Sequence, residues 1–192
     1  MGKNRLEAFS DGVLAIIITI MVLELKVPHG EDIESLKPLM PAFLSYILSF
    51  VYLGIYWNNH HHMIHTVEKV TGAILWANLH LLFWLSLVPF TTAWMGENHF
   101  AAAPVALYGA VMIMAAVAYT ILQRLIISSH GKESVLKKAV GNDIKGKISL
   151  LFYFFAIVSS FYMSSISLFL YGLVALIWFI PDKRIEKVIR AQ

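Results

Sequence analysis

The stretch "RLEAFSDGVLAIIITIMVLELKVP", residues 5–28, joins a polar beginning to a long apolar run. No charged residue occurs between Gly12 and Leu23. Because about 20 helical residues cross the hydrocarbon core of a bilayer, we expect a membrane-spanning helix over residues 6–27. Ser10 and Asp11 lie at the edge of the apolar run. Placing an ionisable group at membrane depth costs free energy unless the group has a polar partner, so we expect Asp11 to have such a partner.

The composition of the whole chain agrees with a membrane protein. The 192 residues are 58% hydrophobic and 14% charged, whereas about a quarter of the residues of a soluble domain are charged. Mean hydropathy is +0.69. Cysteine is absent, which excludes disulfides and thiolate chemistry. We expect an integral membrane protein with a single domain over residues 1–192.

Five further apolar segments follow, at residues 39–59, 72–95, 104–129, 147–164 and 166–181. The last two lie almost entirely within a run of 33 residues without charge, Ile148 to Ile180. At about 1.5 Å per residue this run is about 50 Å long, which is too long for one upright span. The serine-rich segment Met163 to Ser167 is the plausible turn between them.

The distribution of cationic residues decides between five and six spans. With six spans and both termini in the cytoplasm, 13 of the 15 Lys and Arg residues lie on the cytoplasmic side, and only Lys26 and Lys37 lie outside. This asymmetry follows the positive-inside rule. The sequence therefore predicts an all-α membrane protein with six transmembrane helices and both termini cytoplasmic. It also makes nucleic-acid binding improbable, because topology accounts for the basic charge.

The first helix presents two different faces. At about 100° per residue with Ile16 at zero, Ile20 lies at about +40° and Leu23 at about −20°, so the three form one stripe. Ser10 lies at about +120° and Asp11 at about −140°, on the other side of the helix. By periodicity alone, an apolar stripe indicates packing or lipid contact.

The polar pair has two interpretations. Ser10 or Asp11 could cap a helix that begins at Gly12, or both could face the bundle interior and bond to other helices. Arg5 lies six residues from Asp11, so the two do not stack on the helix. Donors on the second and third helices are the candidate partners of Asp11: Trp57, His60, His61, Asn78 and His80.

The histidine-rich segment "HHHMIH", residues 60–65, raises the question of a metal. His61 and His65 have a zinc-compatible spacing, but cysteine is absent and carboxylates nearby are few. Histidines that sense pH at the membrane surface are the favoured interpretation. No phosphate loop, nucleophile elbow, zinc-protease motif or carbonyl filter occurs. We expect neither an enzyme nor a cofactor.

The residues Arg5, Phe9, Ser10 and Asp11 match the motif R-x-x-x-F-S-D, and "YWNNH" and "ANLHLL" follow in the next two helices. The chain therefore resembles the endolysosomal transmembrane-protein-175 potassium channels and their prokaryotic relatives. The resemblance implies a homotetramer of six-span subunits in a prokaryotic cell membrane, with the first helices around a pore permeable to K⁺.

The resemblance also implies roles for single residues. Ile16 corresponds to the apolar constriction that gates and selects, and the further pore residues are Thr19, Ile20 and Leu23. A polar network between helices corresponds to Arg5, Phe9, Ser10, Asp11, Trp57, His60 and Asn78. The histidine run leaves His60 and His61 both open for that network.

The sequence is compatible with three functions. The first is a K⁺-permeable channel with its permeant ions as the ligands. The second is an ion- or proton-coupled transporter that uses Asp11 and the histidines as a relay. The third is a metal-dependent membrane enzyme built on the histidine segment.

Overall fold

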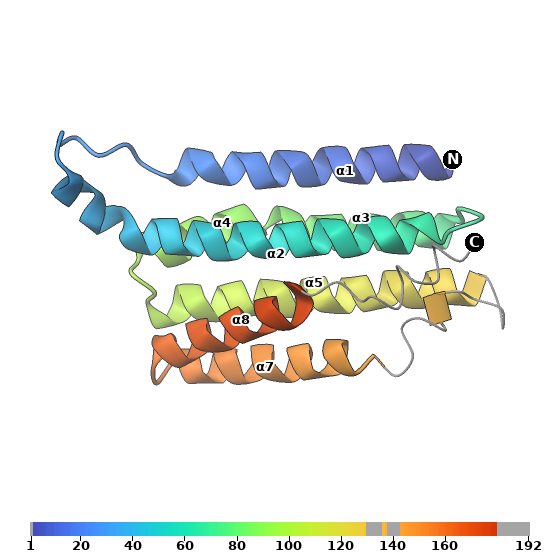
Figure 1. Cartoon of the computed structure of the whole chain (residues 1–192). Helices are drawn as coiled ribbons and strands as arrows, with labels where there is room; N and C mark the ends of the chain where they lie inside the picture. Colours follow the sequence, from blue (N-terminus) through green and yellow to red (C-terminus); the bar gives the residue numbers. More distant parts are fainter. Residues whose placement is uncertain (1, 130–135, 138–142, 180–192) are drawn as a thin grey trace.

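A computed structural model of the chain describes residues 2–129, 136–137 and 143–179, and the regular elements in these ranges are helices. The long helices lie side by side and consecutive ones run in opposite directions (Figure 1). The predicted all-helical fold is confirmed for this part of the chain. In chain order the elements are α1 (Lys3–Ile20), η1 (Met21–Glu24), η2 (Ile33–Leu39), α2 (Met40–His65), α3 (Gly72–Ser86), α4 (Val88–Glu97), α5 (Ala102–Ser129), α7 (Ile144–Ser160) and α8 (Ser164–Phe179), where η marks a 3₁₀-helix.

Four helical segments are long and apolar enough to cross a membrane: Lys3–Glu24, Ile33–His65, Gly72–Glu97 and Ala102–Ser129. The helices α7 and α8 have 17 and 16 residues, which at 1.5 Å per residue makes each about 25 Å long. A helix therefore occupies each of the six segments expected from the sequence, and two of these helices are shorter than a standard span.

Several helix ends differ from the expected ones. The first α-helix ends at Ile20, and the tighter 3₁₀ turn at Met21–Glu24 leads into extended backbone at Leu25. The second helix continues to His65, so the histidine run is helical. The third segment is two helices, because Pro89 lacks the N–H that a continuous helix needs and its ring clashes with the preceding turn.

The turn between α7 and α8 occupies Phe161–Met163, slightly before the expected position. The predicted turn at Met163–Ser167 is wrong in this detail because its last serine has a packing role. Ser167 is fully buried, and its hydroxyl donates to the carbonyl oxygen of Ala156 at 2.6 Å. The serine therefore joins the two helices to each other rather than forming the bend between them.

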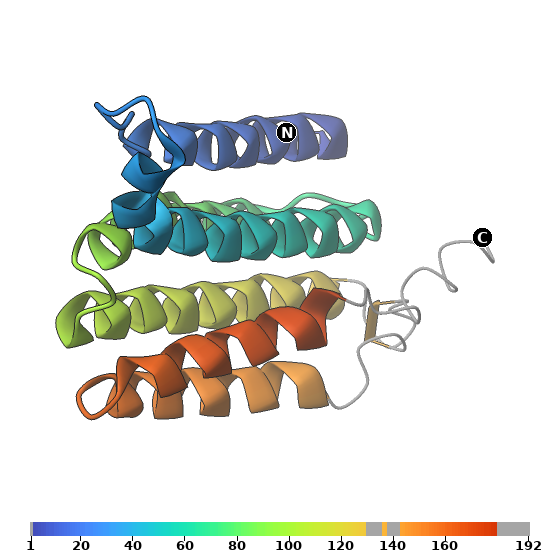
Figure 2. The ribbon, with the colours of Figure 1, turned by 60° about the vertical axis from the view of Figure 1, so that its left-hand side comes forward.

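The helix α1 lies at one edge of the subunit. Its main contacts are with α2, α3 and α4, whereas α5 packs against α3, α4, α7 and α8 in the middle. Figure 2 shows α1 above the other helices and α7 and α8 at the opposite edge. One face of α1 and its 3₁₀ extension is buried, at Leu6, Ser10, Leu14, Ile17 and Met21. The spacing of three or four residues is that of a helix packed on one side.

Candidate functional site

The apolar stripe expected on the first helix is exposed in the single chain. The exposed fractions are 62% for Ile16, 45% for Ile20 and 77% for Leu23. In the 3₁₀ turn each residue advances by about 120°, so Leu23 moves to about +40° and stands in line with Ile20. Thr19 is exposed beside the stripe, and its hydroxyl donates to the carbonyl oxygen of Ala15 at 2.9 Å.

This stripe is the face of α1 that no described segment covers. The opposite face carries Ser10 and the buried residues that pack on α2 and α3. Apolar side chains that follow one stripe of an edge helix contact either lipid or another copy of the chain. The single chain thus offers an apolar helix surface on which a symmetric assembly could close.

Ser10 connects α1 to α3 and, through Asn78, to α2. The Asn78 amide nitrogen Nδ2 donates to Ser10 Oγ at 2.9 Å, and Ser10 Oγ donates to the carbonyl oxygen of Leu6, also at 2.9 Å. The Asn78 oxygen Oδ1 lies 2.7 Å from His60 Nε2. All three residues of this chain of hydrogen bonds, Ser10, Asn78 and His60, are buried.

The direction of these hydrogen bonds fixes the form of His60. An amide oxygen only accepts, so His60 Nε2 donates and the neutral ring leaves Nδ1 unprotonated. Within the described part of the chain, Nδ1 is buried without a hydrogen-bond partner. A proton on Nδ1 would create a buried donor without an acceptor. The arrangement therefore suits a neutral His60.

Asp11 bonds to a different helix from Ser10. Its side chain is half-buried, and the Trp57 indole nitrogen Nε1 donates to Asp11 Oδ1 at 3.1 Å. The capping interpretation of Ser10 and Asp11 is wrong, because α1 begins at Lys3 with Gly2 as its N-cap and both residues lie inside the helix. The two adjacent polar residues therefore connect α1 to two different helices, Ser10 to α3 and Asp11 to α2.

Two residues of the expected network lie outside these contacts. The Arg5 and Phe9 side chains are exposed, and neither forms a hydrogen bond to the described Ser10–Asn78–His60 chain. The structure thus brings together Ser10, Asn78 and His60, and separately Asp11 and Trp57. It leaves the first two residues of the motif on the surface of the single chain.

The remaining candidate histidines have partners other than Asp11. His61 Nδ1 lies 2.9 Å from Glu7 Oε1, and His80 Nε2 accepts from the Trp84 indole at 2.9 Å. The Glu7 contact was not expected from the sequence, although Glu7 lies one turn before Asp11 on the same helix. Of the two adjacent histidines at the end of the motif "YWNNHH", His60 is therefore the one that contacts Asn78.

His61 and His65 of the histidine segment lie toward the surface, whereas His60 is buried. The rings of His61 and His65 are stacked with centroids 6.1 Å apart. In the ranges that the structure describes, no group of three or more His, Cys, Asp or Glu side chains is arranged to hold a metal ion. The Lys3 ammonium donates to the carbonyl oxygen of His65 and joins the beginning of α1 to the end of α2.

Comparison with known proteins places these features in a family. The sequence model of a family described as "Endosomal/lysosomal potassium channel TMEM175" matches residues 5–89, from α1 to the beginning of α4. A potassium channel of Chryseobacterium sp. (strain P1-3) is 62% identical over 190 residues, which are 99% of each chain. The human endosomal/lysosomal proton channel TMEM175 is 36% identical over 86 residues, 38% of this chain and 17% of the human one.

A solved structure resembles the whole chain. The crystal structure of a lysosomal potassium-selective channel TMEM175 homolog from Chamaesiphon minutus superposes with a TM-score of 0.79 and 28% sequence identity. The match covers 94% of this chain and 97% of that one. The likeness therefore extends over α1 to α8 and beyond the residues that the family model matches.

Proposed function

The chain belongs to the TMEM175 family, as the sequence motif indicated, and from this premise we propose that it is a potassium-permeable cation channel. Relatives that match it over almost all of its length are named potassium channels, and none of these names describes an enzyme. The proposal places the channel in a prokaryotic cell membrane. Its ligands are the permeant ions, and it needs no cofactor.

The observation that carries the proposal is the exposed apolar stripe of α1. In a homotetramer, four copies of α1 surround an axis and the four Ile16 side chains form a narrow dry ring. Such a constriction gates by dewetting. An ion that passes sheds part of its hydration, which costs more for Na⁺ than for the larger K⁺. Ile20 and Leu23 add apolar layers, and Thr19 supplies a ring of hydroxyls.

The polar contacts set the direction in which α1 faces. Hydrogen bonds from Ser10 to α3 and from Asp11 to α2 are about 100° apart around the helix, so together they oppose rotation in either sense. Asp11 is then a positioning residue, with Trp57 as its donor. Arg5 and Phe9 remain on the surface of the single chain, where contacts with another subunit could involve them.

The charges at the two ends of the bundle support six spans with both termini cytoplasmic. Lys3, Lys69, Arg124 and Lys145 lie at the end that holds the beginning of α1, the α2–α3 loop and the beginning of α7 (Figure 1). At the other end, the exposed Lys26 forms an ion pair with Glu97. The cationic end is the cytoplasmic one by the positive-inside rule.

The coupled transporter remains the second candidate, because the vertebrate relatives are named proton channels and a proton-coupled carrier also needs a path for protons. A relay would need Asp11 and the histidines to exchange protons. Asp11 instead accepts from the Trp57 indole, and His60 bonds to the Asn78 amide. Neither an indole nor an amide exchanges protons readily near neutral pH, so these two contacts favour the channel. The His61–Glu7 contact joins two titratable groups and is the one that a relay could use.

The test is flux from liposomes that contain the purified protein, with the oligomeric state measured on the same sample by native mass spectrometry. The proposal expects a tetramer and a reversal potential that follows the K⁺ gradient alone. A reversal potential that depends on a fixed ratio of H⁺ to K⁺ would contradict the channel and indicate a coupled transporter.

The constriction is tested with a matched pair of variants. Ile16→Asn places an amide in the ring and is expected to raise conductance or lower K⁺/Na⁺ selectivity. Leu176→Asn is the control, because Leu176 on α8 is 66% exposed, close to the 62% of Ile16. Equal currents in both variants and in the unmodified protein would mean that Ile16 does not form the gate.

A further inference from the structure

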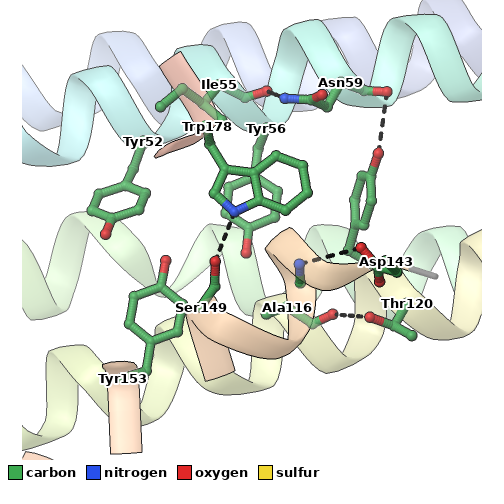
Figure 3. A pocket seen from close by; sticks show the side chains of 12 residues that line it. Tyr52, Ile55, Tyr56, Asn59, Ala116, Thr120, Asp143, Ser149, Tyr153 and Trp178 are labelled. Atoms are coloured by element: carbon green, nitrogen blue, oxygen red, sulfur yellow. Dashed lines mark hydrogen bonds between the residues drawn. The ribbon is translucent and has the colours of Figure 1, made fainter. Parts of the chain in front are cut away.

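A cavity lies between α2, α5, α7 and α8, on a different face of α2 from the one that contacts α1 (Figure 3). It encloses about 540 Å³ of space, its open mouth included. Five of the twelve described residues that line it are aromatic: Tyr52, Tyr56, Tyr119, Tyr153 and Trp178. Figure 3 shows Tyr52 and Tyr153 at one end of the cavity.

The Tyr119 ring stands at a steep angle to the Tyr56 ring and to the Trp178 ring. The centroids of Tyr56 and Tyr119 are 6.1 Å apart with their planes at 70°. Tyr119 and Trp178 have centroids 6.5 Å apart and planes at 72°. Rings arranged in this way form walls of a box rather than a stack. Boxes of aromatic faces bind ammonium groups, because each ring face carries partial negative charge.

Hydrogen bonds hold two of these walls in place without a ligand. The Trp178 indole nitrogen donates to Ser149 Oγ at 2.8 Å. The Tyr119 hydroxyl donates to the carbonyl oxygen of Asn59 at 3.4 Å. Rings that are already ordered lose little side-chain entropy when a ligand binds. The box is therefore preorganised for its occupant.

The charge at the cavity has the sign that an ammonium group needs. Among the described residues that line the cavity, Asp143 alone carries a charge. It is the N-cap of α7, and its carboxylate accepts from the Gly146 N–H at 3.2 Å. The Lys145 ammonium lies 6.0 Å from the centroid of the Trp178 ring. Lys145 is therefore a second cation beside the box, and it competes with the occupant for the Trp178 ring.

We propose that this aromatic cavity is a binding site for an organic ammonium group, primary or methylated, held between Tyr56, Tyr119 and Trp178 and opposite the Asp143 carboxylate. A methylated ammonium is weakly hydrated and enters an apolar box at lower cost than K⁺. Asp143, Gly146 and Ser149 line the cavity from the beginning of α7, which lies at the cationic end of the bundle. Both a lipid headgroup and a free amine carry this chemistry.

The first experiment compares two probes of equal shape and different charge. The protein carries 5-fluorotryptophan and is placed in nanodiscs of phosphatidylglycerol, and fluorine NMR follows the Trp178 resonance, which Trp178→Phe identifies. Choline is expected to shift this resonance saturably, and its neutral isostere 3,3-dimethylbutan-1-ol is not. The resonance of Trp76, which is 75% exposed on α3, is the internal control and should stay in place. Equal shifts by both probes, or equal shifts of both tryptophans, would overturn the proposal.

Variants at the charged groups provide a second test that does not depend on the rings. Asp143→Asn removes the charge but keeps a good N-cap residue that tolerates the left-handed backbone at φ 45°. It is expected to weaken choline binding by about threefold or more, the effect of one partly exposed charge. Lys145→Gln removes a competing cation and should strengthen binding. Unchanged affinity in both variants would contradict a site for cations.

A final comparison shows whether the bound ammonium group belongs to a lipid headgroup or to a free amine. The choline titration is repeated in nanodiscs that contain phosphatidylethanolamine. If the Trp178 resonance is already shifted there and choline moves it no further, the occupant is a lipid headgroup. If choline binds equally in both kinds of nanodisc, the site takes a free amine. The absence of any saturable shift in either nanodisc would refute the site.

Discussion

The hydrogen-bond chain from His60 through Asn78 to Ser10 leads to a quantitative prediction about Asn78→Leu. Leucine has a similar branched shape but neither donates nor accepts, so both interhelical bonds of Asn78, at 2.9 and 2.7 Å, are lost. Ser10 keeps its bond to the Leu6 carbonyl. His60 is left with both ring nitrogens unpartnered in a buried site.

The expected loss follows from measured values for helices in membranes. Interhelical hydrogen bonds there contribute about 0.6 kcal/mol on average and up to about 1.7 kcal/mol. Two such bonds give a decrease of about 1–3 kcal/mol in the free energy of unfolding for Asn78→Leu. Since α1 loses its hydrogen bond to α3, K⁺/Na⁺ selectivity is expected to fall as well.

The assay is a double-mutant cycle of Ser10→Ala and Asn78→Leu, with unfolding by SDS in mixed micelles. The coupling energy of the pair is expected to be about 0.6–1.7 kcal/mol. Thr120→Val is the control partner for Ser10→Ala, because the Thr120 hydroxyl bonds within its own helix to the Ala116 carbonyl. That control cycle should be additive. A coupling between Ser10 and Asn78 that is no larger than the control would refute the structural role of this bond.

Three further substitutions test the packing, each by thermal unfolding in detergent. Gly96→Ala lowers thermal stability, because the new Cβ would lie 2.6 Å from the Ala42 Cα on α2; unchanged stability would show that α2 and α4 are farther apart. Gly12→Ala meets open space and should raise the stability of α1 by up to about 1 kcal/mol, so a loss would contradict the open surface around this residue. Lys26→Gln breaks an exposed ion pair with Glu97, and we expect no measurable change at low or high salt, whereas a clear decrease would mean that the pair is protected from solvent.

The helical segments could be predicted well from the sequence, because backbone N–H and C=O groups in lipid must form hydrogen bonds within their own segment. A run of apolar residues of the right length, bounded by charges, leaves few alternatives to a helix. The break in the third segment follows from Pro89, and this signal was present in the sequence. The 3₁₀ turn after Ile20 has no comparable signal, because no proline or glycine occurs between Met21 and Leu25.

The partners of the polar residues were harder to predict than their positions. The helical period separates Ser10 and Asp11 from Ile16, and the structure has Ser10 buried and Ile16 exposed. The helical period alone does not determine which of several nearby donors bonds to Ser10 or to Asp11. That choice depends on how far α2 and α3 lie from α1 and how they are rotated. His80 illustrates this, because it bonds to Trp84 one turn along its own helix rather than to Asp11.

The absence of cysteine allows a direct test of the central claim, that Ile16 lines a pore at a symmetry axis. A disulfide forms only when two Cβ atoms approach to about 3.5–4.5 Å, which four copies of residue 16 around a narrow axis can reach. The measurement is K⁺ flux from liposomes that contain Ile16→Cys, before and after mild oxidation, with Leu176→Cys as the control. Oxidation is expected to stop the flux of Ile16→Cys alone and to produce disulfide-linked dimers, and reduction is expected to reverse both effects. Undiminished flux and no cross-linked dimer from Ile16→Cys would contradict the central claim.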